Sequence, residues 1–203
     1  VESRYRDRAR LLSLMVPLIP KAQEQRNRTR CQHFFCVLAQ VLLKDHDRGH
    51  SYKLQELTDL DNLPDYNDED EFYASSSRPP VNPDGSPVFY RLPESWDKAA
   101  NDGERLRFAI EQANCDDAKR LWADFLFEQF DFLEMDPNHR QKYYMTPAMM
   151  QSLYDLKDNE SMAALADNVR RITLPDEFNY LEMYRNLNDH LKVGEIYASR
   201  MQF

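Results

Sequence analysis

Two histidines in the segment 46–50 have the spacing of a zinc site on a helix. His46 and His50 lie four residues apart, so a helical turn would place both imidazoles on one face. However, Gly49 lies between them, and no glutamate follows His46 as it does in an HExxH motif. We therefore interpret this segment as a solvated helix end and predict that the chain has no metal site.

The acidic segment that begins at Asp65 resembles a calcium-binding loop only in its composition. An EF-hand loop starting there would need glycine at its sixth position and glutamate at its twelfth. Those positions hold Asp70 and Ser76, so the motif fails. Loose cation binding remains an alternative, but a run of like charges is more typical of a solvated, self-repelling segment.

None of the three cysteines lies in a recognisable catalytic motif. Cys31 and Cys36 are about 500° apart around a helix, which predicts free thiols, and Cys115 stands alone. The four glycines form no phosphate-binding loop, and the serines form no nucleophile elbow. The 35 acidic residues are dispersed, so chance pairs justify no acid–base assignment. We predict no catalytic residue, no cofactor and no enzymatic activity.

The net charge of −9 argues against a nucleic-acid partner, which a basic surface would normally recognise. No stretch reaches the roughly 18–20 apolar residues of a membrane span, which predicts no direct membrane insertion. The first thirty residues are nevertheless basic. We interpret them as a charged face for acidic partners, including the chain's own segment 61–71, with an arm for RNA or anionic lipid as the alternative. Its cations are Arg4, Arg6, Arg8, Arg10, Lys21, Arg26, Arg28 and Arg30.

Apolar residues recur with helical spacing along most of the chain, and almost no segment alternates as a strand would. The prolines at 17 and 20 should end or kink the first helix near Val16. Ser95 and Asp158 are expected to cap the helices that follow them, and strand is confined to residues 88–90. The predicted helices cover 4–19, 21–44, 52–60, 95–113, 117–133, 146–154, 160–171 and 175–191.

These elements predict an all-α fold, an α-α array or solenoid-like (tetratricopeptide-like) domain, although the tetratricopeptide signature itself is not matched. We expect one domain over 1–203, with N-terminal helices in 1–60, an acidic, proline-rich loop or extended arm in 61–94, and a helical array in 95–203. Residues 67–82 are expected to be mobile, and Gly103 to mark a close contact or a weak point. The expected packing residues are Cys31, Phe34, Phe35, Leu38, Val41, Leu42, Trp122, Phe125 and Phe130.

Seven segments occur in an order and spacing that resemble a helical region of large bacterial proteins of the alpha-2-macroglobulin family. In that family this region lies outside the β-sandwich domains and beside tetratricopeptide-like helices. The resemblance covers about residues 2–188. Its segments are Tyr52–Leu60, Leu63–Tyr66, Gly85–Trp96, Asn101–Ala113, Ala123–Phe130, Leu156–Ser161 and Ile172–Tyr180.

The resemblance implies a non-catalytic scaffold or interaction region of a protease-trapping protein, that is, an endopeptidase inhibitor. It also implies export to the periplasm or cell envelope, with other domains of the same longer parent protein, or protein partners, as contacts. The family's Cys-Gly-Glu-Gln thioester is absent, because Gln32 follows Cys31 and Asp116 follows Cys115. The alternative is a free-standing helical adaptor unrelated to protease inhibition.

Overall fold

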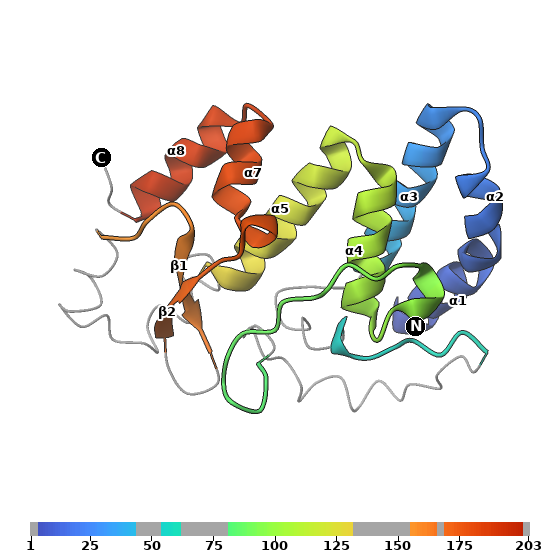
Figure 1. The fold of residues 1–203 in the computed structure, drawn as a ribbon, viewed down its shortest axis with the longest axis horizontal. Coiled ribbons are helices and arrows are strands. Elements are labelled where there is room, and N and C mark those ends of the chain that lie inside the picture. The colour runs from blue at the N-terminus through green and yellow to red at the C-terminus, as the bar shows by residue number, and fades with distance from the viewer. Residues whose placement is uncertain (1–3, 44–53, 62–80, 132–154, 166–168, 201–203) are drawn as a thin grey trace. The chain divides into compact units, whose positions relative to one another are not determined.

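The computed structural model describes residues 4–43, 54–61, 81–131, 155–165 and 169–200. These residues are mostly helical, which confirms the predicted helical class (Figure 1). The chain divides into two units. Unit 1 comprises Val1–Ser76 and Tyr90–Ala118, and unit 2 comprises Ser77–Phe89 and Lys119–Phe203. The single domain expected over 1–203 stays a prediction.

The N-terminal helices of unit 1 break where the prolines predict. Helix α1 (Arg4–Met15) is followed by the 3-10 turn η1 (Val16–Leu18), α2 (Ile19–Gln23) and α3 (Arg28–Leu43). The single helix expected over 21–44 is therefore wrong. Its interruption has a local cause, because the Asn27 side chain accepts a hydrogen bond of 3.1 Å from the Arg30 amide and so caps a new helix.

Helix α4 (Asp102–Ala113) begins later than the sequence pattern indicates. Residues Trp96–Lys98 form only a 3-10 turn, η4, and the Ser95 side chain does not cap it, so that prediction is wrong. Asn101 is extended and its side chain accepts from the Glu104 amide at 2.9 Å, which starts the helix there. In Figure 1, α4 lies beside α3, against which it packs.

Close packing at Gly103 confirms the expected contact. A Cβ at this position would lie 2.3 Å from Cδ1 of Tyr90, which is itself buried. The predicted stripe of α3 is confirmed in part, because Phe34 and Cys31 are only half-buried. The fully buried apolar side chains described in unit 1 are Leu12, Phe35, Leu38, Ala39, Leu42, Leu54, Leu106, Ala109, Ala113 and Ala118.

Aromatic packing on α5 (Asp116–Phe130) forms the centre of unit 2. Trp122, Phe125 and Phe130 are buried, as predicted from their spacing. The Trp122 ring stacks on Phe125, with centroids 5.4 Å apart, and meets Phe178 edge-on at 5.7 Å. Its indole N–H donates to the Glu177 carbonyl at 3.2 Å, so the ring is fixed by both apolar and polar contacts.

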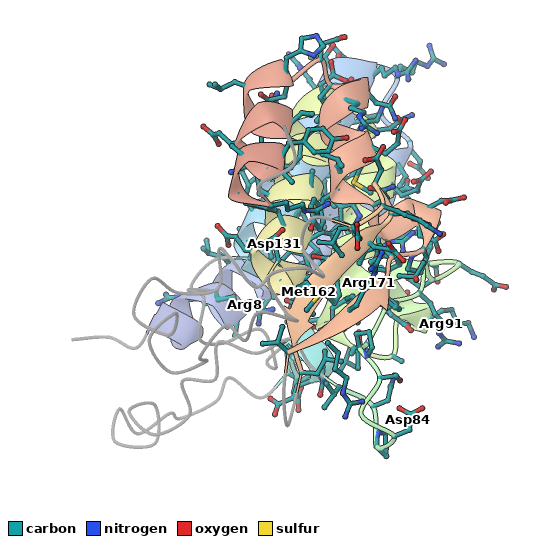
Figure 2. All side chains as sticks on the ribbon, turned by 90° about the vertical axis from the view of Figure 1, so that its left-hand side faces the viewer. Arg8, Asp84, Arg91, Asp131, Met162 and Arg171 are labelled. Carbon is teal, nitrogen blue, oxygen red and sulfur yellow. The ribbon has the colours of Figure 1, made fainter. Side chains whose placement is uncertain are left out.

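A β-hairpin replaces the helix predicted over 160–171. Strands β1 (Glu160–Ala164) and β2 (Val169–Thr173) are antiparallel, with Met162 opposite Arg171 (Figure 2). The helix prediction is wrong because β2 is rich in β-branched residues, which favour a strand. Asp158 caps no helix: its carboxylate pairs with Arg185 at 2.8 Å and accepts from the Tyr197 hydroxyl at 2.7 Å.

Residues 88–90 form no strand, which corrects that expectation. Instead, Val81 and Pro87 form an isolated bridge around a turn at 83–85. Gly85 supplies the turn's positive φ of 78°.

The C-terminal segment contains three short elements instead of one helix. They are the 3-10 turn η6 (Asp176–Phe178), α7 (Tyr180–Asn186) and α8 (His190–Ser199). The helix predicted over 175–191 is wrong because Asn188 takes a φ of 55° and Asp189 starts a new helix, accepting from the Lys192 amide at 3.1 Å. The helix predicted over 146–154 and the segment 67–82 lie outside the described residues, apart from Val81 and Asn82.

Candidate functional site

A shallow, mostly apolar groove of about 470 Å³ lies on unit 1 between the end of α1 and the first half of α3. Met15 lines it from α1. The remaining lining comes from α3, where the residues recur at positions that share one side of a helix. They are Thr29, Arg30, His33, Phe34 and Val37.

The two sides of α3 differ in how far their apolar side chains are buried. Phe35, Leu38 and Leu42 are fully buried and pack into unit 1, whereas Phe34 and Val37 are half-buried on the groove side. The helix is therefore apolar on more of its circumference than its own core uses. A helical stripe wider than the core requires is typical of a binding surface.

Exposed leucines extend the apolar surface along α1 and η1. Leu14 is 65% exposed and Leu18 is 47% exposed, and Leu11 is 36% exposed. Isolated exposed leucines are common on protein surfaces. Here Leu11 and Leu14 lie on α1, which also supplies Met15 to the groove, and Leu18 lies in η1, which follows directly. Together they enlarge the apolar face that a partner could cover.

The described side chains from residue 8 to 43 carry an excess of exposed positive charge. One exposed acid, Glu24, occurs there. The exposed cations are Arg10, Lys21, Arg26, Arg28 and Arg30, of which Arg30 lines the groove. This surface is basic in a chain whose net charge is −9, so it favours acidic groups over basic ones.

A buried ionic network holds α1 against the rest of unit 1. Arg8, labelled in Figure 2, donates from Nη2 to Asp102 Oδ2 at 2.7 Å and from Nε to the Leu42 carbonyl at 3.1 Å. Its Nη1 donates to the Thr58 hydroxyl at 2.9 Å. A single guanidinium therefore connects α1 to α3, to α4 and to the segment 54–61.

Asp102 is the acceptor at the centre of this network, and its side chain is fully buried. It also accepts from Arg105 Nη1 at 3.0 Å and from the hydroxyl of Thr58 at 2.5 Å. The Thr58 amide donates to the same carboxylate at 3.2 Å. Four donors thus engage this carboxylate, which ties α1 and the segment 54–61 to α4.

Unit 2 contains a second buried polar cluster at the end of α5. The Tyr180 hydroxyl donates to Asp131 at 3.0 Å, lies 2.9 Å from the Ser161 hydroxyl and accepts from Arg200 Nη2 at 2.7 Å. Burial, and then the Asp131 carboxylate, raises the pKa of Tyr180 well above its usual value. The phenol is therefore protonated at neutral pH and serves as a hydrogen-bond centre, not as a base.

Two of the candidate metal-binding segments considered from the sequence fall on residues that the structure does not describe. His46, His50 and the acidic residues from 62 to 71 lie outside the described residues. Among the described residues, no group of three histidines, cysteines or carboxylates is placed to hold a metal ion. Within the same ranges, no helix is long and apolar enough to cross a membrane.

The basic composition of the N-terminal segment predicts a surface position for Arg8, but the structure buries it at 7% exposure. A signal was available, because Arg8 lies one helical turn before the buried Leu12 and therefore on the core side of α1. Asp102 and Thr58 gave no comparable signal. The two side chains meet through a contact between positions 44 residues apart in the sequence. The spacing of apolar residues along a helix gives no information about such a contact.

Comparison of the chain with protein-family models, with curated proteins and with solved structures finds no match.

Proposed function

We propose that this chain is a non-catalytic helical scaffold and interaction region, and that the groove between α1 and α3 binds an acidic, amphipathic helix of a protein partner. The observation that carries the proposal is the apolar groove on a basic surface. A helix with an apolar stripe fits such a groove, and acidic residues beside the stripe complement the cations.

The sequence resemblance to alpha-2-macroglobulin-family proteins supports a more specific version of the proposal. In that version the parent is an exported bacterial protease-trapping protein, and the partner helix belongs to another of its domains. A tetratricopeptide-like α-α array is the proposed architecture, supported by the packing of α1 and α4 against α3 and of α7 against α8. The alternative is a free-standing adaptor, for which the same groove would bind a separate protein.

A binding titration tests the groove. The probe is a synthetic helical peptide with leucines at i, i+3, i+4 and i+7 and glutamates elsewhere, labelled for fluorescence anisotropy. We expect saturable binding that weakens as salt is added, because rim charges contribute through screened electrostatics. The matching peptide with lysines in place of the glutamates is expected to bind at least tenfold more weakly.

Paired substitutions separate groove binding from general association. Phe34→Ala should weaken binding about tenfold, because it removes an aromatic anchor from the groove, whereas Leu191→Ala on α8 should not. Arg30→Glu should weaken binding and flatten the salt dependence, whereas Lys119→Glu should leave both unchanged. If the groove variants and the control variants weakened peptide binding equally, specific binding in the groove would be contradicted.

The gene that encodes the chain separates the two versions of the proposal. A reading frame that continues into β-rich domains and a bait segment would support the protease-trapping parent. A natural chain without such domains would favour the free-standing adaptor.

A further inference from the structure

We propose that Cys36 and Cys115 form a reversible disulfide that links α3 to the junction of α4 and α5 when the chain meets a disulfide oxidant such as oxidised glutathione. This inference does not depend on the proposed function of the groove. All three cysteines are free thiols in the structure, so the proposal concerns an oxidised form of the same fold.

Helices α3 and α4 lie side by side in Figure 1. Their packing brings together two cysteines that are 79 residues apart in the sequence. Asn114 takes the left-handed conformation after α4, with φ 41° and ψ 49°, and so turns the chain there. Its carbonyl accepts a hydrogen bond of 3.1 Å from Gln32 Nε2 on α3. Cys115 is the next residue along the chain, and Cys36 lies one helical turn after Gln32 on the same face of α3.

The Cys115 side chain neighbours the Cys36 thiol in the reduced structure, close enough to act on it. Burial, the neighbouring Cys115 and the Asp117 carboxylate together raise the pKa of the Cys36 thiol. Cys36 is buried, whereas Cys115 is half-buried and faces solvent in part. Cys115 is therefore the thiol that an oxidant reaches first, and Cys36 is the one that resolves the intermediate.

Oxidised glutathione is the one oxidant that this thiol–disulfide exchange needs. The Cys115 thiolate attacks one sulfur of oxidised glutathione, forming a mixed disulfide and releasing one glutathione. The Cys36 thiolate then attacks the Cys115 sulfur, its proton passes to solvent, and the second glutathione leaves and is protonated. Two protein thiols are oxidised to one disulfide, and one molecule of oxidised glutathione is reduced to two thiols.

Cys31 provides the matched control on the same helix. It is half-buried and lies five residues before Cys36, about 500° around α3, so it points away from the partner of Cys36. A sequence-based pairing of Cys31 with Cys36 is disfavoured for the same reason. The structure thus distinguishes one pair among the three cysteines.

The test is a thiol count on the full chain after equilibration with oxidised glutathione under native conditions. We expect the wild-type chain to fall from three reactive thiols to one in denaturant. In a tryptic map, the peptide 31–44, which holds both Cys31 and Cys36, should be joined to the Cys115 peptide, and fragmentation of this pair should place the bond at Cys36. Cys31→Ser should fall from two thiols to none. Cys36→Ser and Cys115→Ser should each lose the internal disulfide.

Several outcomes would overturn the proposal. They are retention of all three thiols, a stable glutathione adduct on Cys115 without the internal bond, or a disulfide that joins two chains on a non-reducing gel. Fragmentation of the joined wild-type peptides, and the Cys31→Ser map in which Cys36 is the single cysteine of 31–44, both locate the bond, so the result does not depend on whether Cys36→Ser folds.

Discussion

Replacing Asp102 by alanine should destabilise unit 1 more than any exposed substitution. The change removes the acceptor of four donors: the guanidinium of Arg8, that of Arg105, and both the hydroxyl and the amide of Thr58. Arg8 and Arg105 are 7% and 8% exposed, so both cations would be left buried with no carboxylate. Breaking a buried pair in this way costs about 3–5 kcal/mol of unfolding free energy.

Chemical denaturation measures this cost, with Trp96 as the reporter. Trp96 is buried in unit 1 and the Arg105 guanidinium lies 4.9 Å from its ring centroid, so its fluorescence follows the network directly. A Trp122→Phe background removes the tryptophan of unit 2 from the signal. The expected result is a lower urea midpoint with an unchanged slope.

Two companion variants make the measurement discriminating. Asp102→Asn keeps the shape but removes the charge, and it should cost about 2–3 kcal/mol because charge-assisted hydrogen bonds become neutral. Asp97→Asn, at an exposed position in the same unit, should stay within about 0.5 kcal/mol of the wild type. A cost below about 1 kcal/mol for Asp102→Ala would refute the reasoning, since it would mean that water reaches both guanidinium groups.

Three further changes have defined outcomes. Gly103→Ala should destabilise unit 1 by about 1–3 kcal/mol in urea denaturation, although alanine favours helices, because its Cβ would overlap the Tyr90 ring at 2.3 Å; a more stable variant would contradict the packing. Trp122→Ala should cost about 3–5 kcal/mol in urea denaturation followed by far-ultraviolet circular dichroism, and a cost near zero would mean an exposed ring. The Arg120 hydrogen bond lowers the pKa of Asp189 below its usual 3.8. The ionised Asp189 therefore stabilises the folded state above pH 3.8, and this stabilisation is lost as the pH falls through the folded pKa. In Asp189→Asn, the unfolding free energy, followed by Trp122 fluorescence, should therefore fall less steeply with decreasing pH below about pH 4 than in the wild type. The same pH dependence in both chains would contradict the pairing of Asp189 with Arg120.

Periodicity predicted those helices whose apolar spacing is clear. Helix α5 and the burial of its aromatic residues Trp122, Phe125 and Phe130 follow directly from that spacing. The break near Val16 follows from proline chemistry. These features depend on neighbours within a few residues, which is the range that a single sequence reports.

The hairpin over 160–173 could not be predicted in the same way. The apolar positions Met162, Leu165 and Val169 fit a helix as well as strands, and the decision depends on distant contacts. Ser161 is one of these, because its hydroxyl donates to the Phe130 carbonyl at 2.9 Å and is fully buried beside Tyr180. Tertiary contacts thus override a local preference that is nearly balanced.

The candidate site was also only partly predictable. The basic character of the N-terminal helices is visible in the sequence, but the groove is not, because Phe34 was assigned to the core by its spacing. It lies on the groove side of α3, and the neighbouring Phe35 takes the core position. The contact between Cys36 and Cys115 likewise depends on the turn at Asn114, which no spacing rule indicates.

The most direct test of the interaction-module account is a nuclear magnetic resonance titration of the isotope-labelled chain with the glutamate-rich amphipathic peptide. The account predicts shift changes at the groove residues Met15, His33, Phe34 and Val37, with the amides of α7 and α8 unchanged. Shifts confined to α7 and α8, or no shifts at peptide concentrations that saturate the anisotropy signal, would contradict it.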